Sequence, residues 1–151
     1  MYAHKTSDES RNTTTTLTAD SELEFAVEAN KTYDVVVQLL LASASATPDF
    51  KFDFVGPSGY TPYFGPQVYQ SAGRWSGVSV ATAPSALLTT GDVVEQGSTG
   101  AAAIFGLQIT ATIKTGANAG NVQLRWAQNT SNGSDVTVKA GSFIRYAQAS
   151  A

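Results

Sequence analysis

The chain has 151 residues, of which 42% are hydrophobic and 14% are charged, and its net charge is −3. This length suits a single domain. With no cysteine and one histidine, the chain excludes a disulfide framework, a thiol catalyst and a multi-histidine metal site built within one chain. The negative charge argues against nucleic acid as the main partner, because binding to nucleic acid normally needs a basic face.

The first twelve residues are polar and rich in charge. Their charged side chains are Lys5, Asp8, Glu9 and Arg11. Apart from Tyr2, they hold no large apolar side chain that would dock them on a core of their own chain. We therefore predict an extended N-terminal arm over residues 1–12, followed by one domain over residues 13–151.

Strands are predicted along the rest of the chain from side chains that alternate with period two and from β-branched runs. The expected strands cover residues 13–18, 22–27, 32–41, 49–55, 74–82, 101–114, 122–127, 136–138 and 143–146, and residues 86–92 form a short strand or turn. The clearest alternation is in residues 49–55, where three phenylalanines point one way and Lys51 and Asp53 point to the solvated face. Residues 32–41 alternate less cleanly, which indicates a central strand covered on both faces.

The fold class follows from these strands and the turns between them. No stretch of useful length shows the 3.6-residue period of an amphipathic helix, and Asn132-Gly133 is a typical hairpin turn. The sequence therefore predicts an all-β protein with a single β-sandwich, most simply a jelly roll. The most apolar run, residues 35–46, is too short to cross a bilayer, which takes about 20 residues, and no membrane partner is expected.

A long aromatic loop is predicted over residues 60–73, because Pro62 and Pro66 are incompatible with a central strand. The aromatic side chains in and beside this loop are Tyr60, Tyr63, Phe64, Tyr69 and Trp75. Two interpretations stay open. The rings stack on sugars, as in all-β lectin-like modules, or they pack in the core or in a subunit interface.

The sequence contains no convincing catalytic constellation. Glu22 and Glu24 share the polar face of one strand, as Asp49 and Asp53 do on another, and both pairs are best explained as solvated strand charges. The chain has no P-loop, no dinucleotide fingerprint and no serine nucleophile elbow. We therefore predict that the protein is not an enzyme and that it uses no metal or cofactor.

Several segments carry a resemblance that covers nearly the whole chain. They are residues 5–17, 23–33, 49–59, 122–129 and 136–142, which read KTSDESRNTTTTL, LEFAVEANKTY, DFKFDFVGPSG, VQLRWAQN and VTVKAGS. Together they resemble a type of small virion structural protein found in tailed bacteriophages. The resemblance implies a β-sandwich in the phage particle and leaves open a place on the head or in the tail.

In this setting the main hypothesis is a capsid decoration (cement) protein on the outer surface of the head. The arm would order on the major capsid protein by adding a strand to an exposed edge, and its contacts would come from His4, Lys5, Asp8, Glu9 and Arg11. Shell symmetry favours homotrimers, and a charge-poor surface suits the packing of copies against one another. The competing hypothesis is a tail-fibre or tail-tip module that grips host glycans with the aromatic loop.

Overall fold

The computed structural model describes residues 1–69, 79–80, 94–96 and 103–149. These residues form strands and connecting turns, and the fold is all-β with two antiparallel sheets. The strands are β1 (Tyr2–His4), β2 (Glu9–Arg11), β3 (Thr18–Val27), β4 (Thr32–Ser43), β5 (Phe50–Val55), β6 (Thr61–Tyr69), β7 (Ser79–Val80), β8 (Val94–Gln96), β9 (Phe105–Lys114), β10 (Gly120–Gln128), β11 (Val136–Val138) and β12 (Phe143–Gln148). The all-β class predicted from the alternation is thus confirmed.

The larger sheet is organised around the long strand β4. On one side β4 pairs with β9, which pairs in turn with β6. On its other side β4 pairs with β12 along one half and with β11 along the other half. The N-terminal strands extend this side, since β1 pairs with β12 and β2 pairs with β11.

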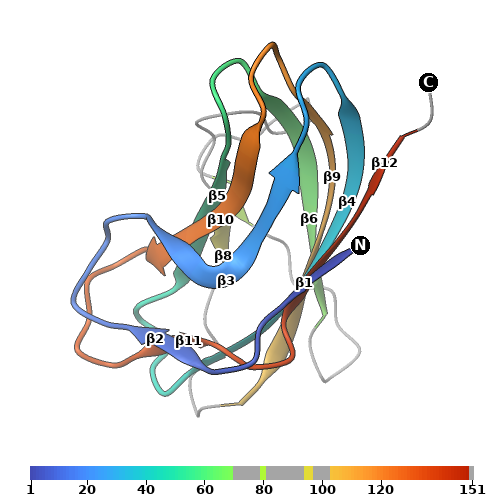
Figure 1. Cartoon of the computed structure of the whole chain (residues 1–151). Coiled ribbons are helices and arrows are strands. Elements are labelled where there is room, and N and C mark those ends of the chain that lie inside the picture. Colours follow the sequence, from blue (N-terminus) through green and yellow to red (C-terminus); the bar gives the residue numbers. More distant parts are fainter. Residues whose placement is uncertain (70–78, 81–93, 97–102, 150–151) are drawn as a thin grey trace.

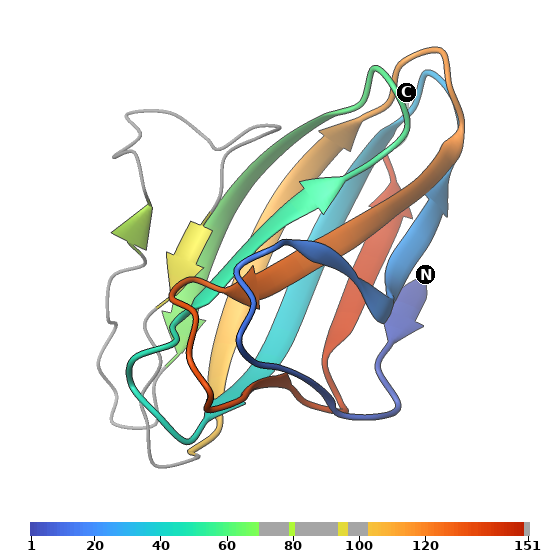
Figure 2. The same ribbon diagram turned by 90° about the vertical axis from the view of Figure 1, so that its left-hand side faces the viewer.

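The smaller sheet has the strand order β3-β10-β5-β8-β7 and lies across the inner face of the larger sheet (Figure 1). Figure 2 shows the two layers from the side, with β10 and β5 in front of the strands of the larger sheet. This is a sandwich-like arrangement, in which each sheet buries one face against the other.

The core between the sheets is built from the alternating apolar side chains. Phe50, Phe52 and Phe54 of β5 are all buried, as the alternation predicted. Phe64 of β6 joins the two layers, because its ring lies 5.4 Å from the ring of Phe54 and 6.2 Å from that of Phe52 between centroids. On the far side of the core Phe25 of β3 stacks on Tyr146 of β12 at 4.3 Å.

The predicted loop over residues 60–73 is corrected by β6, which covers residues 61–69 of it. Among the described strands β6 pairs with β9 alone, so it is an edge strand. Proline has no backbone N–H, and in a central strand the N–H groups on both sides donate to a neighbouring strand. An edge strand has one side without a neighbour, so a missing N–H on that side removes no hydrogen bond. Pro62 and Pro66 are therefore compatible with the strand, and the sequence argument had excluded only a central position.

The predicted N-terminal arm also differs from the structure. Residues 2–4 and 9–11 form β1 and β2 at the margin of the larger sheet, and the terminal amine of Met1 donates a hydrogen bond of 2.9 Å to the carbonyl of Tyr146. The segment is thus folded onto the same chain and does not extend from it. The other predicted strands, over residues 74–82 and 86–92, lie outside the described residues except for β7.

Candidate functional site

The N-terminal segment is held by a buried ion pair. The side chain of Lys5, between β1 and β2, is completely buried, and its ammonium nitrogen lies 2.8 Å from Oδ1 of Asp20 in β3. Oε2 of Glu9 lies 2.9 Å from the same nitrogen and Oε2 of Glu22 lies 3.8 Å away. Three carboxylates therefore surround one ammonium group.

Asp20 connects this ammonium group to the smaller sheet. Its Oδ2 accepts a hydrogen bond of 2.9 Å from Nε1 of Trp126 in β10. Its Oδ1 accepts bonds of 3.0 Å from the backbone N–H groups of Glu22 and Leu23. Both carboxylate oxygens thus have donors, as a buried charge requires, and the N-terminal segment is joined to both layers of the fold.

Arg11 of β2 forms the second half of this attachment. Its guanidinium carbon lies 3.9 Å from the centre of a Trp126 ring, a distance at which a cation is attracted to the aromatic face. The same group donates hydrogen bonds of 2.8 Å to the carbonyls of Thr18 and Ala19, and it forms an ion pair with Glu9. The planar guanidinium therefore satisfies several acceptors of β3 at once.

Glu9, Glu22 and Lys5 have shifted pKa values. Burial raises the pKa of Glu9, but hydrogen bonds from Lys5, Arg11 and Ser21 outweigh burial and hold the pKa at about 2. Hydrogen bonds from the hydroxyl and N–H of Thr6 lower the pKa of Glu22 to about 2 as well. Burial lowers the pKa of Lys5, but its hydrogen bonds to Asp20 and Glu9 dominate and raise that pKa above its ordinary value.

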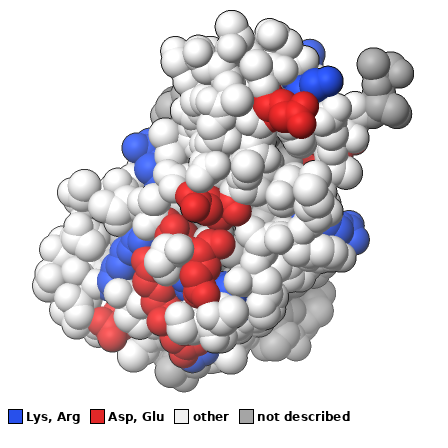
Figure 3. Space-filling model, in the orientation of Figure 1, with Lys and Arg blue, Asp and Glu red and all other residues white. Residues whose placement is uncertain are grey.

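A surface pair completes the attachment. Asp8 forms an ion pair with Lys139 and accepts a hydrogen bond of 2.8 Å from the backbone N–H of Ala140. The hydrogen bond from Lys139 lowers the pKa of Asp8. Figure 3 shows the acidic side chains gathered over β2 and β3, with basic atoms beside them.

The structure shows where the predicted shell-contact residues lie within the chain, and their contact with a shell stays a prediction. Lys5, Asp8, Glu9 and Arg11 all contact the chain's own domain, and the exposed His4 lies opposite Phe143 in the β1–β12 ladder. Sequence reasoning missed the partners Asp20 and Trp126, which come from strands 15 and 121 residues downstream of Lys5. Asp20 lies at a polar position of a predicted turn, and no local pattern marks it as buried.

The predicted aromatic residues separate into different environments. Phe64 is a core residue, and the half-buried Tyr60 packs against the core with its hydroxyl donating to the carbonyl of Phe54. Tyr63 lies on the outer face of β6, and Tyr69 is the last residue of that strand. Trp75 lies outside the described residues. Of the described side chains in this set, Tyr63 is therefore the one on an open surface.

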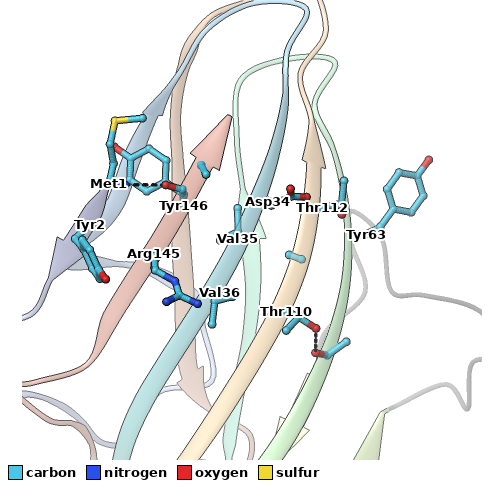
Figure 4. Close-up of a pocket in the computed structure, with 13 residues that line it drawn as sticks. Met1, Tyr2, Asp34, Val35, Val36, Tyr63, Thr110, Thr112, Arg145 and Tyr146 are labelled. Atoms are coloured by element: carbon cyan, nitrogen blue, oxygen red, sulfur yellow. Dashed lines mark hydrogen bonds between the residues drawn. The ribbon is translucent and has the colours of Figure 1, made fainter. Parts of the chain in front are cut away.

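A groove of about 570 Å³ crosses the outer face of the larger sheet, and Tyr63 lies at its β6 end with the ring pointing away from the other labelled side chains (Figure 4). One row of outward residues is set by the strand register, because Arg145 pairs with Val36, Val36 with Thr110 and Thr110 with Gly65. Tyr2 continues this row opposite Arg145. The groove therefore spans five adjacent strands.

A second row lies two residues along the strands on the same face. In this row Ala147 pairs with Asp34, Asp34 with Thr112 and Thr112 with Tyr63. The two rows combine small or apolar residues with hydroxyl-bearing or charged ones, and the small or apolar ones are Val36, Gly65 and Ala147. The groove therefore offers hydrogen-bonding groups beside apolar surface.

Two opposite charges in the groove have no side-chain partner within the described part of the chain. Arg145 and Asp34 are both exposed, and neither forms an ion pair or a side-chain hydrogen bond with a described residue. Arg145 differs in this respect from Arg11 and Arg125, whose guanidinium groups are paired. Sequence analysis did not select Arg145 or Asp34. Their polar positions in alternating strands indicate an outward-facing side chain, and this was the only signal that pointed to them.

The predicted solvated face of β5 also needs a correction. Asp53 is buried, with 3% of its surface exposed, because Arg125 of β10 lies directly opposite it and forms a two-pronged ion pair. Glu24 is hydrogen-bonded to Gln123 on the neighbouring strand. Within the described ranges, no group of three histidine, cysteine or acidic residues could hold a metal ion, and no helix is long and apolar enough to cross a membrane.

Comparisons with known proteins add no relative. The chain matches no protein-family model, and no curated protein and no solved structure matched it. The function has to be argued from the residues and the fold.

Proposed function

We propose that this protein is a structural component of a tailed-phage virion, a decoration protein on the outer surface of the head, built on a jelly-roll domain. It would bind the major capsid protein and copies of itself and would catalyse no reaction. The sequence resemblance suggests the virion, and one observation on the fold, the nested order of strand pairs, supports the domain type.

The nested order is as follows. In a jelly roll, an antiparallel ribbon of eight strands rolls up, so that the first strand pairs with the eighth, the second with the seventh and the third with the sixth. Counting from β3 as the first strand, these pairs correspond to β3–β10, β4–β9 and β5–β8. Rolling brings the eighth strand beside the third and the seventh beside the fourth, which corresponds to β10–β5 and β9–β6. The two-residue strand β7, the fifth in this count, departs from the nested order, because among the described residues it pairs with β8 and not with β6.

A jelly roll is a common domain of viral capsids and of lectins, and a fold alone does not determine function. The resemblance to phage virion proteins therefore selects between the two settings. In this proposal the N-terminal segment does not reach the shell. It completes the larger sheet, and contacts with the shell come from the outer surface of the domain.

The experiment is to locate and count the chain in purified particles by quantitative mass spectrometry and cryo-electron microscopy. A decoration protein is expected in a copy number of the same order as the major capsid protein, with density on the outer head surface. A few copies per particle, located at the tail tip, would contradict head decoration and support the tail module. Absence from purified particles would overturn both forms of the proposal.

Self-association has its own test. A homotrimer is expected from the symmetry of phage shells. The mass of the purified chain in solution, measured by light scattering over a range of concentrations, should approach three times 15.8 kDa. A mass of one chain at all concentrations and on the particle would contradict the trimer.

A further inference from the structure

We propose that the groove on the outer face of the larger sheet binds an oligosaccharide. The inference concerns this surface and does not depend on whether the chain is located on a head or on a tail. The molecule has two charged regions that differ in pairing. The charges near β2 and β3 are paired with one another, whereas Arg145 and Asp34 in the groove are not paired with any described residue.

The chemistry of the lining fits a sugar chain. A sugar ring carries hydroxyl groups that both donate and accept hydrogen bonds, and it also has apolar C–H faces. Arg145 can only donate and Asp34, when ionised, can only accept, and the hydroxyls of Thr110 and Thr112 on the next strand do both. Tyr2 and Tyr63 supply aromatic surfaces near the two ends, and rings with one polar end suit such half-polar ligands. The charges of Arg145 and Asp34 cancel, and the terminal ammonium group of Met1, which also lines the groove, leaves one net positive charge. This charge balance suits a neutral or an acidic sugar.

The shape of the groove fits an extended ligand. Five adjacent strands are separated by four spacings of about 4.8 Å each, so the row from Tyr2 to Gly65 spans roughly 19 Å. The volume of about 570 Å³ lies within the range of ligand-binding sites. A chain of sugar residues matches this length better than one monosaccharide.

The other macromolecular occupant would be a protein segment, and the geometry favours it less. Peptides that join a sheet usually add a strand at an open edge, where backbone groups are free. The groove instead crosses the face of the sheet, where the backbone groups are already paired in ladders. Protein interfaces also need a desolvated apolar centre. In the middle of this groove Val36 is flanked on its two neighbouring strands by the polar side chains of Arg145 and Thr110, which interrupt such a centre.

Gly65 offers a sharp test. A side chain built on Gly65 would meet no atom within 4 Å, so a leucine there projects into the groove without displacing the core. Gly133, in the turn after β10, is a matched control, since a side chain there also meets no atom within 4 Å. Gly65→Leu should therefore block the groove, whereas Gly133→Leu should leave it open.

The experiment applies the fluorescently labelled full chain to a printed array of bacterial surface polysaccharides and defined neutral and acidic oligosaccharides. Binding to at least one glycan is expected. Gly65→Leu and Arg145→Ala should each weaken that binding at least tenfold, with the melting temperature unchanged, whereas Gly133→Leu and Lys31→Ala should bind as the wild type does. Lys31 matches Arg145 as an exposed cation away from the groove.

Three results would overturn the proposal. These are no binding to any printed glycan, binding that Gly65→Leu and Arg145→Ala leave intact, and binding that all four variants weaken equally. If Gly65→Leu abolishes attachment to phage heads while no glycan binds, the groove is a protein-docking surface. Head decoration would then stand and the sugar site would fail.

Discussion

Lys5 and Asp20 form a salt bridge of 2.8 Å in which neither side chain reaches solvent. The two residues belong to different layers, since Lys5 follows β1 of the larger sheet and Asp20 lies in β3 of the smaller one. Taking two charges out of water is costly, and the cost is offset only when both are fully hydrogen-bonded. Here Glu9 and Trp126 supply the additional bonds.

Removing one member of this pair should be strongly destabilising. Lys5→Met leaves the carboxylate of Asp20 buried without its cation, and we expect the free energy of unfolding to fall by about 3–5 kcal/mol. Urea unfolding followed by tryptophan fluorescence measures this. Lys139→Met is the control, because its pair with Asp8 is partly exposed, and it should cost less than about 1 kcal/mol. Equal effects of the two substitutions would contradict a special role for Lys5.

Acid should destabilise the fold through Glu9 and Glu22. Their pKa values are lowered from 4.5 to about 2 in the folded chain. A carboxyl group whose pKa is lower in the folded state contributes stability that is present above pH 4.5 and is lost as the pH falls toward 2. The melting temperature should therefore decline over this window.

The variants Glu9→Gln and Glu22→Gln should flatten that decline, because an amide does not titrate. Glu28→Gln should not, since Glu28 is exposed and its side chain has no partner among the described residues. Melting curves recorded from pH 7 to pH 2.5 test this. A wild-type melting temperature that stays constant down to pH 2.5 would show that these carboxylates are not coupled to folding.

Deleting residues 1–12 should lower the stability of the isolated chain, whether or not the segment also contacts a shell. The deletion removes β1, β2 and Lys5, so that β11 and β12 lose a paired neighbour and Asp20 loses its cation. For a chain of this size we expect a fall in melting temperature of roughly 10 °C or more. A truncated chain that melts like the wild type would mean that the segment is dispensable for the fold.

Arg125 and Asp53 form a cross-strand pair that is buried unequally, with 35% of the Arg125 side chain exposed and 4% of the Asp53 side chain. Arg125→Met should lower the free energy of unfolding by about 1–3 kcal/mol, because it leaves a buried carboxylate without its strongest donor. The double variant Arg125→Met/Asp53→Leu should recover part of this loss, since neither charge remains. A double-mutant cycle in urea measures both values, and additive effects would show that the pair is not coupled.

Individual strands were the most predictable part of the fold. In β5, in β9 and over residues 122–126 of β10 every second residue is apolar, and these residues are buried in the structure. Period two is a local property of extended backbone, so the sequence alone indicates which face points to the core. The loop predicted over residues 60–73 was wrong over residues 61–69, which form β6. The argument from proline applies to a central strand, and local sequence does not reveal which strand lies at an edge.

The sites were less predictable, because their residues come together only through strand pairing. Tyr63 was selected as a candidate, but Arg145 and Asp34 share a groove with it only through pairing of β12 with β4, β4 with β9 and β9 with β6. The charges of the N-terminal segment were recognised, but their partners were not. A charged residue at a polar position of the sequence does not show whether the fold will place a residue of the other sign next to it.

By itself, the sequence determined the all-β class, the inward face of the main strands and the absence of cysteine chemistry. All three depend on residue type and on spacing within a few positions. The tertiary structure decided that residues 1–12 belong to the sheet, that Lys5 and Asp53 are buried, and that the groove has Arg145 near one end and Tyr63 near the other. Those outcomes depend on pairing between residues that are far apart in the chain. Burying a charge is favourable only once its partner is in place.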